Sequence, residues 1–149
     1  MEYQIGNEDL MLTVSDMGAE MISIKYQEKE YLWQGDKKYW MDHAPNLFPY
    51  VGRFTNGIYT FKGKEYHMDI HGFAKDSIFQ VMDKSSSRIS FILKDTPKTY
   101  DIYPFHFVFI VIYSVSSNNI KIRYQIKNRS NEIMYFGLGG HPGYCVPMD

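Results

Sequence analysis

Residues 120–128 read IKIRYQIKN, and this stretch carries the strongest structural signal in the 149-residue chain. Every second position is apolar, and the positions between are lysine, arginine or glutamine until the final asparagine. A β-strand with one buried face and one hydrated face produces this period of two. The SSNN sequence just before it, at 116–119, predicts the loop of a hairpin.

The segment in front of this loop, FHFVFIVIYSV at 105–115, is apolar on both faces, which is typical of a central strand in a sandwich. No stretch has the apolar spacing of a helix. The sequence therefore predicts an all-β, antiparallel, sandwich-like fold, in one domain that spans residues 1–149. The other expected strands lie near residues 10–14, 22–24, 31–33, 58–61, 66–68, 78–82, 89–93 and 133–138.

Composition narrows the class of function. Hydrophobic residues make up 44% of the chain and aromatic residues 17%, which favours an ordered core. A net charge of -1 gives no basic surface for nucleic acid or an anionic membrane. The longest apolar run, 105–113, is too short to span a bilayer, and the N-terminus lacks the pattern of a secretion signal. Cys145 has no second cysteine to pair with, so we expect a reducing, cytoplasmic location.

An irregular region rich in aromatic residues and proline, 39–54, interrupts the strand pattern. Irregular segments on a rigid β scaffold are where binding sites tend to lie. Within this region is NLFPYVGR, residues 46–53. Pro49 restricts the backbone, Gly52 permits a tight bend, and Arg53 offers a planar set of donors for hydroxyl groups. Taken alone, the stretch reads as a loop with a surface arginine.

The second motif is HMDIHGFAKD at 67–76. Its two histidines are four residues apart, a spacing that brings them together on a helix, whereas the context here is a strand leading into a turn. No cysteine or glutamate completes a familiar zinc ligand set, so no metal is expected. His71 precedes Gly72 at a strand end, where a neutral imidazole suits hydroxyl recognition or proton transfer. A half-buried structural histidine is an equal alternative from these residues alone.

The third motif is FGLGGHPGYCVP at 136–147. Glycines before His141 leave room for a ligand and let the backbone twist sharply, which favours a functional role over a plain loop. Of the other histidines, His43 is a weak candidate for ligand contact, and His106 is expected in the core or at an interface. Cys145 has no evident activating partner, which argues against a nucleophile.

In this order on an all-β chain, FPYVGRFTNG, HGFAKD and GGHPGY resemble the aldose 1-epimerase (galactose mutarotase) family, and most closely its LacX-like branch. Each motif alone is weak, whereas their order and spacing are specific. The resemblance implies an antiparallel β-sandwich of the galactose-mutarotase type, a supersandwich, of which this chain is the N-terminal half. It also implies interconversion of the α and β anomers of free aldoses, without a metal or an organic cofactor.

The resemblance implies roles for particular residues. His141 is the expected general acid that protonates the ring oxygen, and His71 is expected to bind and polarise the same region. Arg53 and Asn56 are expected to hold the sugar. Ring opening needs one proton delivered to the ring oxygen while another leaves the anomeric hydroxyl, and an imidazole titrating near neutrality suits this transfer. The aromatic content adds a separate hypothesis, in which sugar-stacking walls are formed by Trp40, Phe48 and Phe73.

Two features depart from the family pattern. The family's Asn-Arg pair is Asn56-Gly57 here, and Arg53 is the expected substitute. The family's catalytic base, a glutamate late in a much longer chain, and a sugar-binding aspartate have no counterpart before Asp149. A half sandwich leaves strand edges and an apolar face open. We therefore expect a fragment that self-associates or pairs with a missing C-terminal half.

Three classes of function stay open on the sequence. The first is a carbohydrate isomerase resembling aldose 1-epimerase, the second a non-catalytic carbohydrate-binding domain, and the third a structural β-domain. A positioned carboxylate base separates the first from the second, and sugar binding separates both from the third. The sequence does not name the sugar, but it has no Gly-rich phosphate loop, which favours free sugars over phosphorylated ones.

Overall fold

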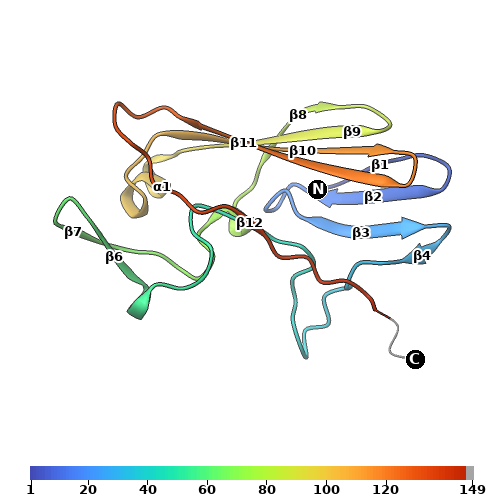
Figure 1. Ribbon diagram of the computed structural model, residues 1–149, viewed down its shortest axis with the longest axis horizontal. Coiled ribbons are helices and arrows are strands. Elements are labelled where there is room, and N and C mark those ends of the chain that lie inside the picture. The colour runs from blue at the N-terminus through green and yellow to red at the C-terminus, as the bar shows by residue number, and fades with distance from the viewer. Residues whose placement is uncertain (147–149) are drawn as a thin grey trace.

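The computed structural model describes residues 1–146, which form antiparallel sheets (Figure 1). One four-stranded sheet has the order β1-β2-β3-β4 and the other β11-β10-β9-β8, while β12-β5 and β6-β7 form two-stranded sheets. The strands are β1 (Glu2–Gly6), β2 (Leu10–Ser15), β3 (Met21–Tyr26), β4 (Lys29–Glu30), β5 (Asn46–Leu47), β6 (Ile58–Phe61), β7 (Lys64–His67), β8 (Gln80–Lys84), β9 (Arg88–Lys94), β10 (Phe107–Ser116), β11 (Asn119–Asn128) and β12 (Gly139–Gly140). The helical segments are α1 (Pro97–Ile102) and the 3-10 turns η1 (Thr55–Gly57) and η2 (Ala74–Asp76).

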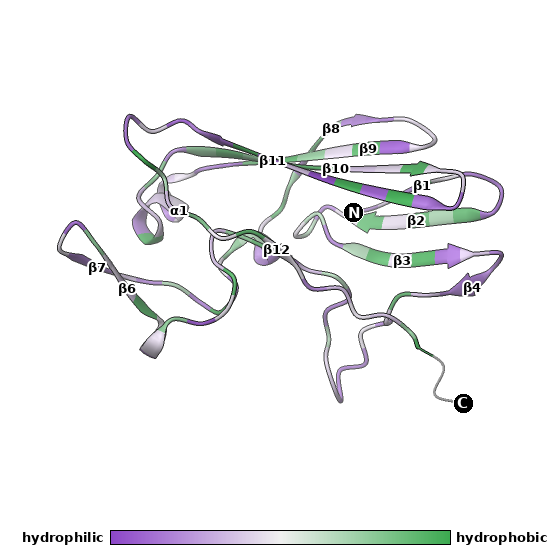
Figure 2. Cartoon of the chain, viewed as in Figure 1, coloured by the Kyte–Doolittle hydropathy of each residue, from purple (hydrophilic) through white to green (hydrophobic). Residues whose placement is uncertain are grey.

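The two four-stranded sheets lie over one another and share one core (Figure 1). Leu12 and Val14 of β2 are fully buried, as are Phe91 of β9 and Phe109 of β10. The apolar residues concentrate along β2, β3 and β10, and the outer turns are hydrophilic (Figure 2). The predicted all-β antiparallel fold is confirmed.

The hairpin predicted for residues 105–128 forms as expected. β10 pairs with β11 along its whole length, from Phe107 opposite Asn128 to Ser116 opposite Asn119. Its other edge pairs with β9, so β10 is a central strand and is buried along most of its length. β11 alternates between exposed and half-buried positions. Among residues 1–146, β11 has a strand partner on one edge only, so its second edge is open.

Several local expectations were wrong. Residues 31–33 form no strand, because only Leu32 makes an isolated bridge there, to Tyr144. Residues 97–102 form a short helix, because Thr96 and Thr99 cap it reciprocally and Pro97 fits the first turn. Residues 133–138 form no strand, since the Gly137 N–H donates to the Pro49 carbonyl, which belongs to no strand, rather than to a ladder. None of the helices within residues 1–146 has the length and apolar character needed to cross a membrane.

A further error concerns His106, which is exposed, so its expected place in the core is wrong and a place at an interface stays a prediction. It lies just before β10, where its Nδ1 is 2.6 Å from the Asp95 carboxylate. Its ring stacks on Tyr100 with centroids 4.8 Å apart. The apolar residues beside His106 in the sequence favoured a buried position. Its polar partner Asp95 comes close only because the chain turns back through α1.

Candidate functional site

The second and third motifs, seventy residues apart in the chain, meet at two histidines. The ring centroids of His71 and His141 are 5.7 Å apart, and those of Trp40 and His141 are 5.0 Å apart. Arg53 of the first motif lies close enough for its positive charge to act on the titration of His71. The structure therefore brings residues of all three motifs into one cluster.

The first and second motifs are joined by two hydrogen bonds between Gly52 and His71, one to the His71 side chain and one from its backbone. The Gly52 N–H donates to Nδ1 of His71 at 3.0 Å, and the His71 N–H donates to the Gly52 carbonyl at 2.8 Å. Nearby, the Phe73 N–H donates to the Phe48 carbonyl at 3.1 Å. Gly72 has a φ of 76°, and a Cβ there would stand 2.3 Å from the Phe48 oxygen. Only glycine allows the two loops to approach this closely.

These contacts define the protonation state of His71. Because Nδ1 accepts the Gly52 N–H, the neutral ring carries its proton on Nε2 and presents an N–H donor on its other side. Burial lowers the pKa of His71, and the nearby His141, Lys75 and Arg53 lower it further, while Asp42 opposes them. His71 is therefore a neutral hydrogen-bond donor at neutral pH.

Lowering the pH is expected to separate Gly52 from His71, because protonated Nδ1 is a donor and cannot accept the Gly52 N–H. The folded-state pKa of His71 is lower than the usual value of about 6.5, so the contact persists through neutral pH. The folded protein binds this proton less readily than the unfolded chain, so stability falls as the pH drops below about 6.5. NMR titration with pH tests this expectation. A Gly52 amide chemical shift that does not change as His71 becomes protonated contradicts it.

The backbone around His141 is held against the irregular region. β12 pairs with β5, and the His141 N–H donates to the Pro45 carbonyl at 3.1 Å. Two residues later, a Cβ at Gly143 would stand 2.9 Å from both Trp33 and Trp40. The chain is thus confined on both sides of His141, while the imidazole itself stays exposed.

The other predicted sugar-binding residues lie around this cluster in different settings. Arg53 and Asn56 are exposed, and Arg53 has no ion pair among residues 1–146. Asn56 sits in the η1 turn with a φ of 55°. Phe73 is half-buried and packs edge-on against Phe48. Their roles in sugar binding stay predictions.

One proposed aromatic wall is wrong, and one charged residue was missed. Phe48 is 0% exposed, so it packs in the core and cannot stack on a sugar. Asp42 acts electrostatically on His71, but a single aspartate in an irregular loop has no sequence pattern that points to it. His43 is bound instead to Glu20, whose carboxylate accepts its backbone N–H at 2.7 Å. Over residues 1–146, no three histidine, cysteine, aspartate or glutamate side chains gather as a metal site.

The family model for aldose 1-epimerase matches residues 1–148. The chain belongs to the aldose 1-epimerase family. Among curated proteins, it is 29% identical over 155 residues to the chromosomal LacX protein of Lactococcus lactis subsp. lactis, covering 99% of this chain and 52% of that protein. The chain spans about half the length of the curated relatives it matches.

Solved structures of the family show the same relation. A galactose mutarotase related enzyme from Lactobacillus acidophilus is 43% identical, with a TM-score of 0.97 over 100% of this chain and 50% of its own. A galactose mutarotase-like protein from Lactobacillus casei is 33% identical, with a TM-score of 0.97 over 100% of this chain and 51% of its own. The predicted resemblance to the N-terminal half of a LacX-like aldose 1-epimerase, with its galactose-mutarotase fold, is confirmed.

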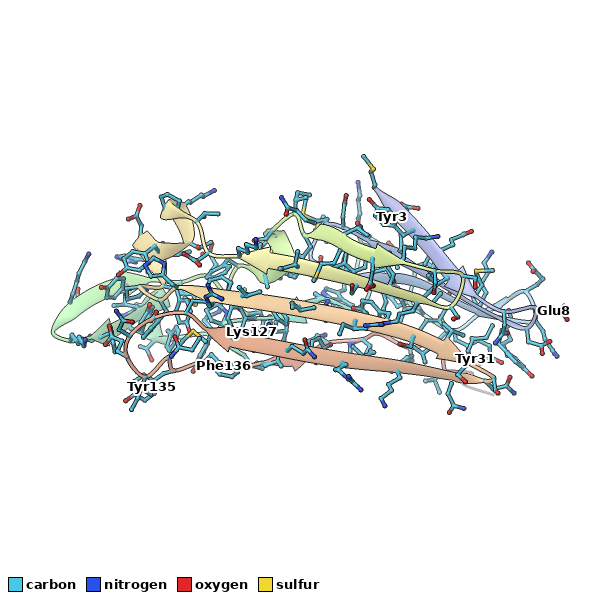
Figure 3. The ribbon with its side chains drawn as sticks, turned by 90° about the horizontal axis from the view of Figure 1, so that it is seen from above. Tyr3, Glu8, Tyr31, Lys127, Tyr135 and Phe136 are labelled. Carbon is cyan, nitrogen blue, oxygen red and sulfur yellow. The ribbon has the colours of Figure 1, made fainter. Side chains whose placement is uncertain are left out.

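An apolar cleft of about 570 Å³ opens between the β6–β7 hairpin and residues 135–137 of this family member. Tyr50 and Phe54 stack at 3.7 Å, and Phe54 stacks on Tyr59 at 5.2 Å, to form one wall. Burial raises the pKa of Tyr59 to about 12. Tyr135 and Phe136 project at the end of the molecule far from Glu8, and they are 65% and 49% exposed (Figure 3). The cleft is lined by Pro49, Tyr50, Val51, Phe54, Tyr59, Thr60, Phe61, Met68, Tyr103, Phe105, Tyr135, Phe136 and Gly137.

Proposed function

We propose that this chain carries the acid and part of the sugar pocket of an aldose 1-epimerase, which interconverts the α and β anomers of free aldoses. The observation that carries the proposal is the pair of imidazoles, His71 and His141, with ring centroids 5.7 Å apart beside Arg53 in a member of this family. A neutral imidazole donor next to an exposed imidazole suits recognition of a sugar ring oxygen and proton transfer to it.

The proposed reaction divides the work between the two histidines. His141 gives a proton to the ring oxygen as the bond between that oxygen and the anomeric carbon breaks. The anomeric hydroxyl loses its proton to a base, so that an open-chain aldehyde forms. His71 donates its Nε2–H to the same region of the sugar, and Arg53 holds neighbouring hydroxyls. Rotation of the carbonyl and the reverse transfers close the ring as the other anomer.

Two further predicted residues complete the pocket. Asn56 offers an amide to sugar hydroxyls from the η1 turn, and Phe73 supplies an apolar surface beside His71. We assign no base within residues 1–146. The base is instead a carboxylate of the segment that corresponds to the second half of the longer relatives, and no cofactor takes part.

The same second half is the proposed occupant of the apolar cleft. The aromatic walls of the cleft are half-exposed in this chain, and contiguous exposed apolar surface of this kind marks interaction sites. The Lactobacillus acidophilus relative matches this chain over only 50% of its own length, so about half of that relative has no equivalent in this chain and could occupy such a surface. The open edge of β11 adds a row of unpaired backbone groups. Cleft and edge together offer a surface for a β-rich polypeptide.

Replacing Tyr135 and Phe136 together with serine is expected to weaken pairing with the separately produced second half of the Lactobacillus acidophilus relative by roughly tenfold or more. Both side chains line the cleft and are partly exposed, so the change removes apolar contact area with little loss of folding. Calorimetry measures the affinity, and Met82→Ser on β8, at a residue 54% exposed, is the control. Equal affinities in all three chains, or a homodimer that the cleft variant abolishes, would overturn this choice of occupant.

Polarimetry tests the proposed activity. Fresh α-galactose or α-glucose is followed with the chain alone and with the chain plus the same second half. Mutarotation faster than the buffer rate supports the isomerase. Sugar binding without acceleration favours the non-catalytic carbohydrate-binding domain, and the absence of both favours a structural domain.

A further inference from the structure

A buried polar network lies directly behind the strand that carries His141. The Asn46 side chain, in a residue 2% exposed, donates to the carbonyls of Gly18 and Ala19 at 3.0 and 2.9 Å. Its amide nitrogen is also 3.1 Å from the Tyr113 hydroxyl, which donates to the Ala19 carbonyl at 2.7 Å. Its oxygen accepts the Tyr124 hydroxyl at 2.8 Å. Asn46 therefore uses both ends of its amide in hydrogen bonds to other parts of the fold.

This network ties four elements together. Residues 18–19 form the turn between β2 and β3, Tyr113 belongs to β10, Tyr124 belongs to β11, and Asn46 opens β5. No buried side-chain polar atom within residues 1–146 lacks a partner. A fully satisfied buried network favours one arrangement, because any shift leaves a costly unpaired group. The place of β5 relative to the sandwich is therefore fixed by side-chain chemistry rather than by apolar packing alone.

The backbone of β5 and of the residue before it in turn holds the backbone at His141. Asn46 stands opposite Gly140 in the β5–β12 pair, and the next residue, His141, donates its N–H to Pro45 at 3.1 Å. On the other side, the Tyr124 hydroxyl lies 3.4 Å from where a Cβ of Gly140 would stand. The hydroxyl that binds Asn46 thus also borders the backbone just before His141.

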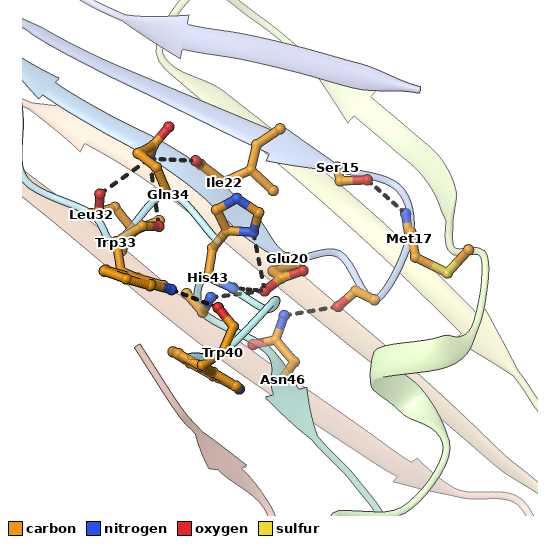
Figure 4. A network of polar contacts seen from close by, with 12 residues as sticks. Ser15, Met17, Glu20, Ile22, Leu32, Trp33, Gln34, Trp40, His43 and Asn46 are labelled. Carbon is orange, nitrogen blue, oxygen red and sulfur yellow. Dashed lines mark hydrogen bonds and ion pairs between the residues drawn. The ribbon is translucent and has the colours of Figure 1, made fainter. Parts of the chain in front are cut away.

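A second anchor acts on the segment before β5. One carboxylate oxygen of Glu20 accepts the N–H groups of His43 and Ala44 at 2.7 and 2.8 Å (Figure 4). The Gly143 N–H donates to the His43 carbonyl at 2.9 Å. The backbone on each side of His141 is therefore hydrogen-bonded to a segment that Glu20 or Asn46 holds.

We propose that Asn46 and Glu20 are positioning residues for His141. Their hydrogen bonds fix residues 43–47, and the backbone contacts of that segment set where the imidazole of His141 stands relative to His71. Neither residue contacts the sugar. The catalytic meaning of this positioning rests on the proposed function, whereas the positioning itself is a property of the sugar-free protein.

Tyr124→Phe tests the Asn46 anchor, because it removes only the hydroxyl that donates to the Asn46 oxygen. Ser90→Ala is the matched control, since buried Ser90 donates one hydrogen bond to Asp83 at 2.7 Å, between β9 and β8. NMR of the imidazole signals without sugar is expected to show a displaced His141 in Tyr124→Phe and an unchanged one in Ser90→Ala. Similar losses of melting temperature with the same His141 signals in both variants would overturn the proposal.

Glu20 provides a second arm that does not depend on a buried tyrosine. Glu20→Ala removes the acceptor and is expected to shift the His141 signals, while Glu20→Gln keeps an oxygen for the same N–H groups and restores them. If mutarotation is present with the second half, its rate falls by roughly tenfold or more in Glu20→Ala and recovers in Glu20→Gln. Unchanged His141 signals in Glu20→Ala contradict the positioning role. Absence of mutarotation in the wild-type chain contradicts only the proposed function.

Discussion

Gly72→Ala is expected to lower the free energy of unfolding by about 3 kcal/mol or more. The residue has a φ of 76°, and its new Cβ would meet the Phe48 oxygen at 2.3 Å and the Pro49 nitrogen at 2.7 Å. These are backbone atoms of a fully buried segment, so they cannot move aside as a flexible side chain would. Urea unfolding measures the loss.

Gly63→Ala separates the effect of the clash from that of the backbone angle. Gly63 has the same φ of 76°, but no atom lies within 4 Å of the position of its Cβ. Its replacement is expected to cost only about 1–2 kcal/mol, the usual penalty of a left-handed alanine. Similar losses in the two variants would show that the two loops do not meet as closely as the structure indicates.

If the proposed mutarotation occurs in the presence of the second half of the Lactobacillus acidophilus relative, His141→Gln is expected to lower its rate by a factor on the order of 10²–10⁴. Glutamine keeps a polar side chain of similar size, but its amide cannot give up and take back a proton as an imidazole can. Because the His141 side chain is exposed and only its backbone N–H is hydrogen-bonded within the described part of the chain, folding should be little affected. Polarimetry measures the rate.

His67→Gln is the control for this loss. His67 belongs to the same sequence motif as His71, but it is exposed on β7, so its replacement should leave the rate unchanged. A variant lacking the His141 imidazole that still accelerates mutarotation at the wild-type rate would exclude His141 as the acid. Equal losses in both variants would point to a general effect on the fold.

The sheets could be predicted because their signals are local. In β10 and β11, the alternation of side chains and a polar loop specify both the strands and their pairing. The helix α1 was not predicted, because a six-residue segment is too short to show a helical apolar period. Thr96 and Pro97 are nevertheless recognisable start signals. Short helices are therefore better sought from their caps than from periodicity.

The sequence predicted the candidate site residues, but not the hydrogen bonds from other segments that hold them in place. His71 and His141 stand out beside glycines, and family resemblance joined them to Arg53. The supports depend on contacts between distant segments: Asn46 binds carbonyls of a turn 27 or 28 residues earlier and a tyrosine 78 residues later. No pattern within one segment encodes such contacts. The burial of Phe48 was missed for the same reason, since it depends on aromatic partners from β10 and its flanks.

The central claim is that the cluster around His71 and His141 is the sugar site of this chain. NMR titration of the labelled chain with free galactose and glucose tests it most directly. We expect saturable shifts in the signals of Gly52, Arg53, His71 and His141, with β8 and β9 unaffected, and loss of these shifts in Arg53→Ala. Signals of both histidines that stay unchanged at millimolar sugar, with the chain alone and with the second half of the Lactobacillus acidophilus relative bound, would contradict the account.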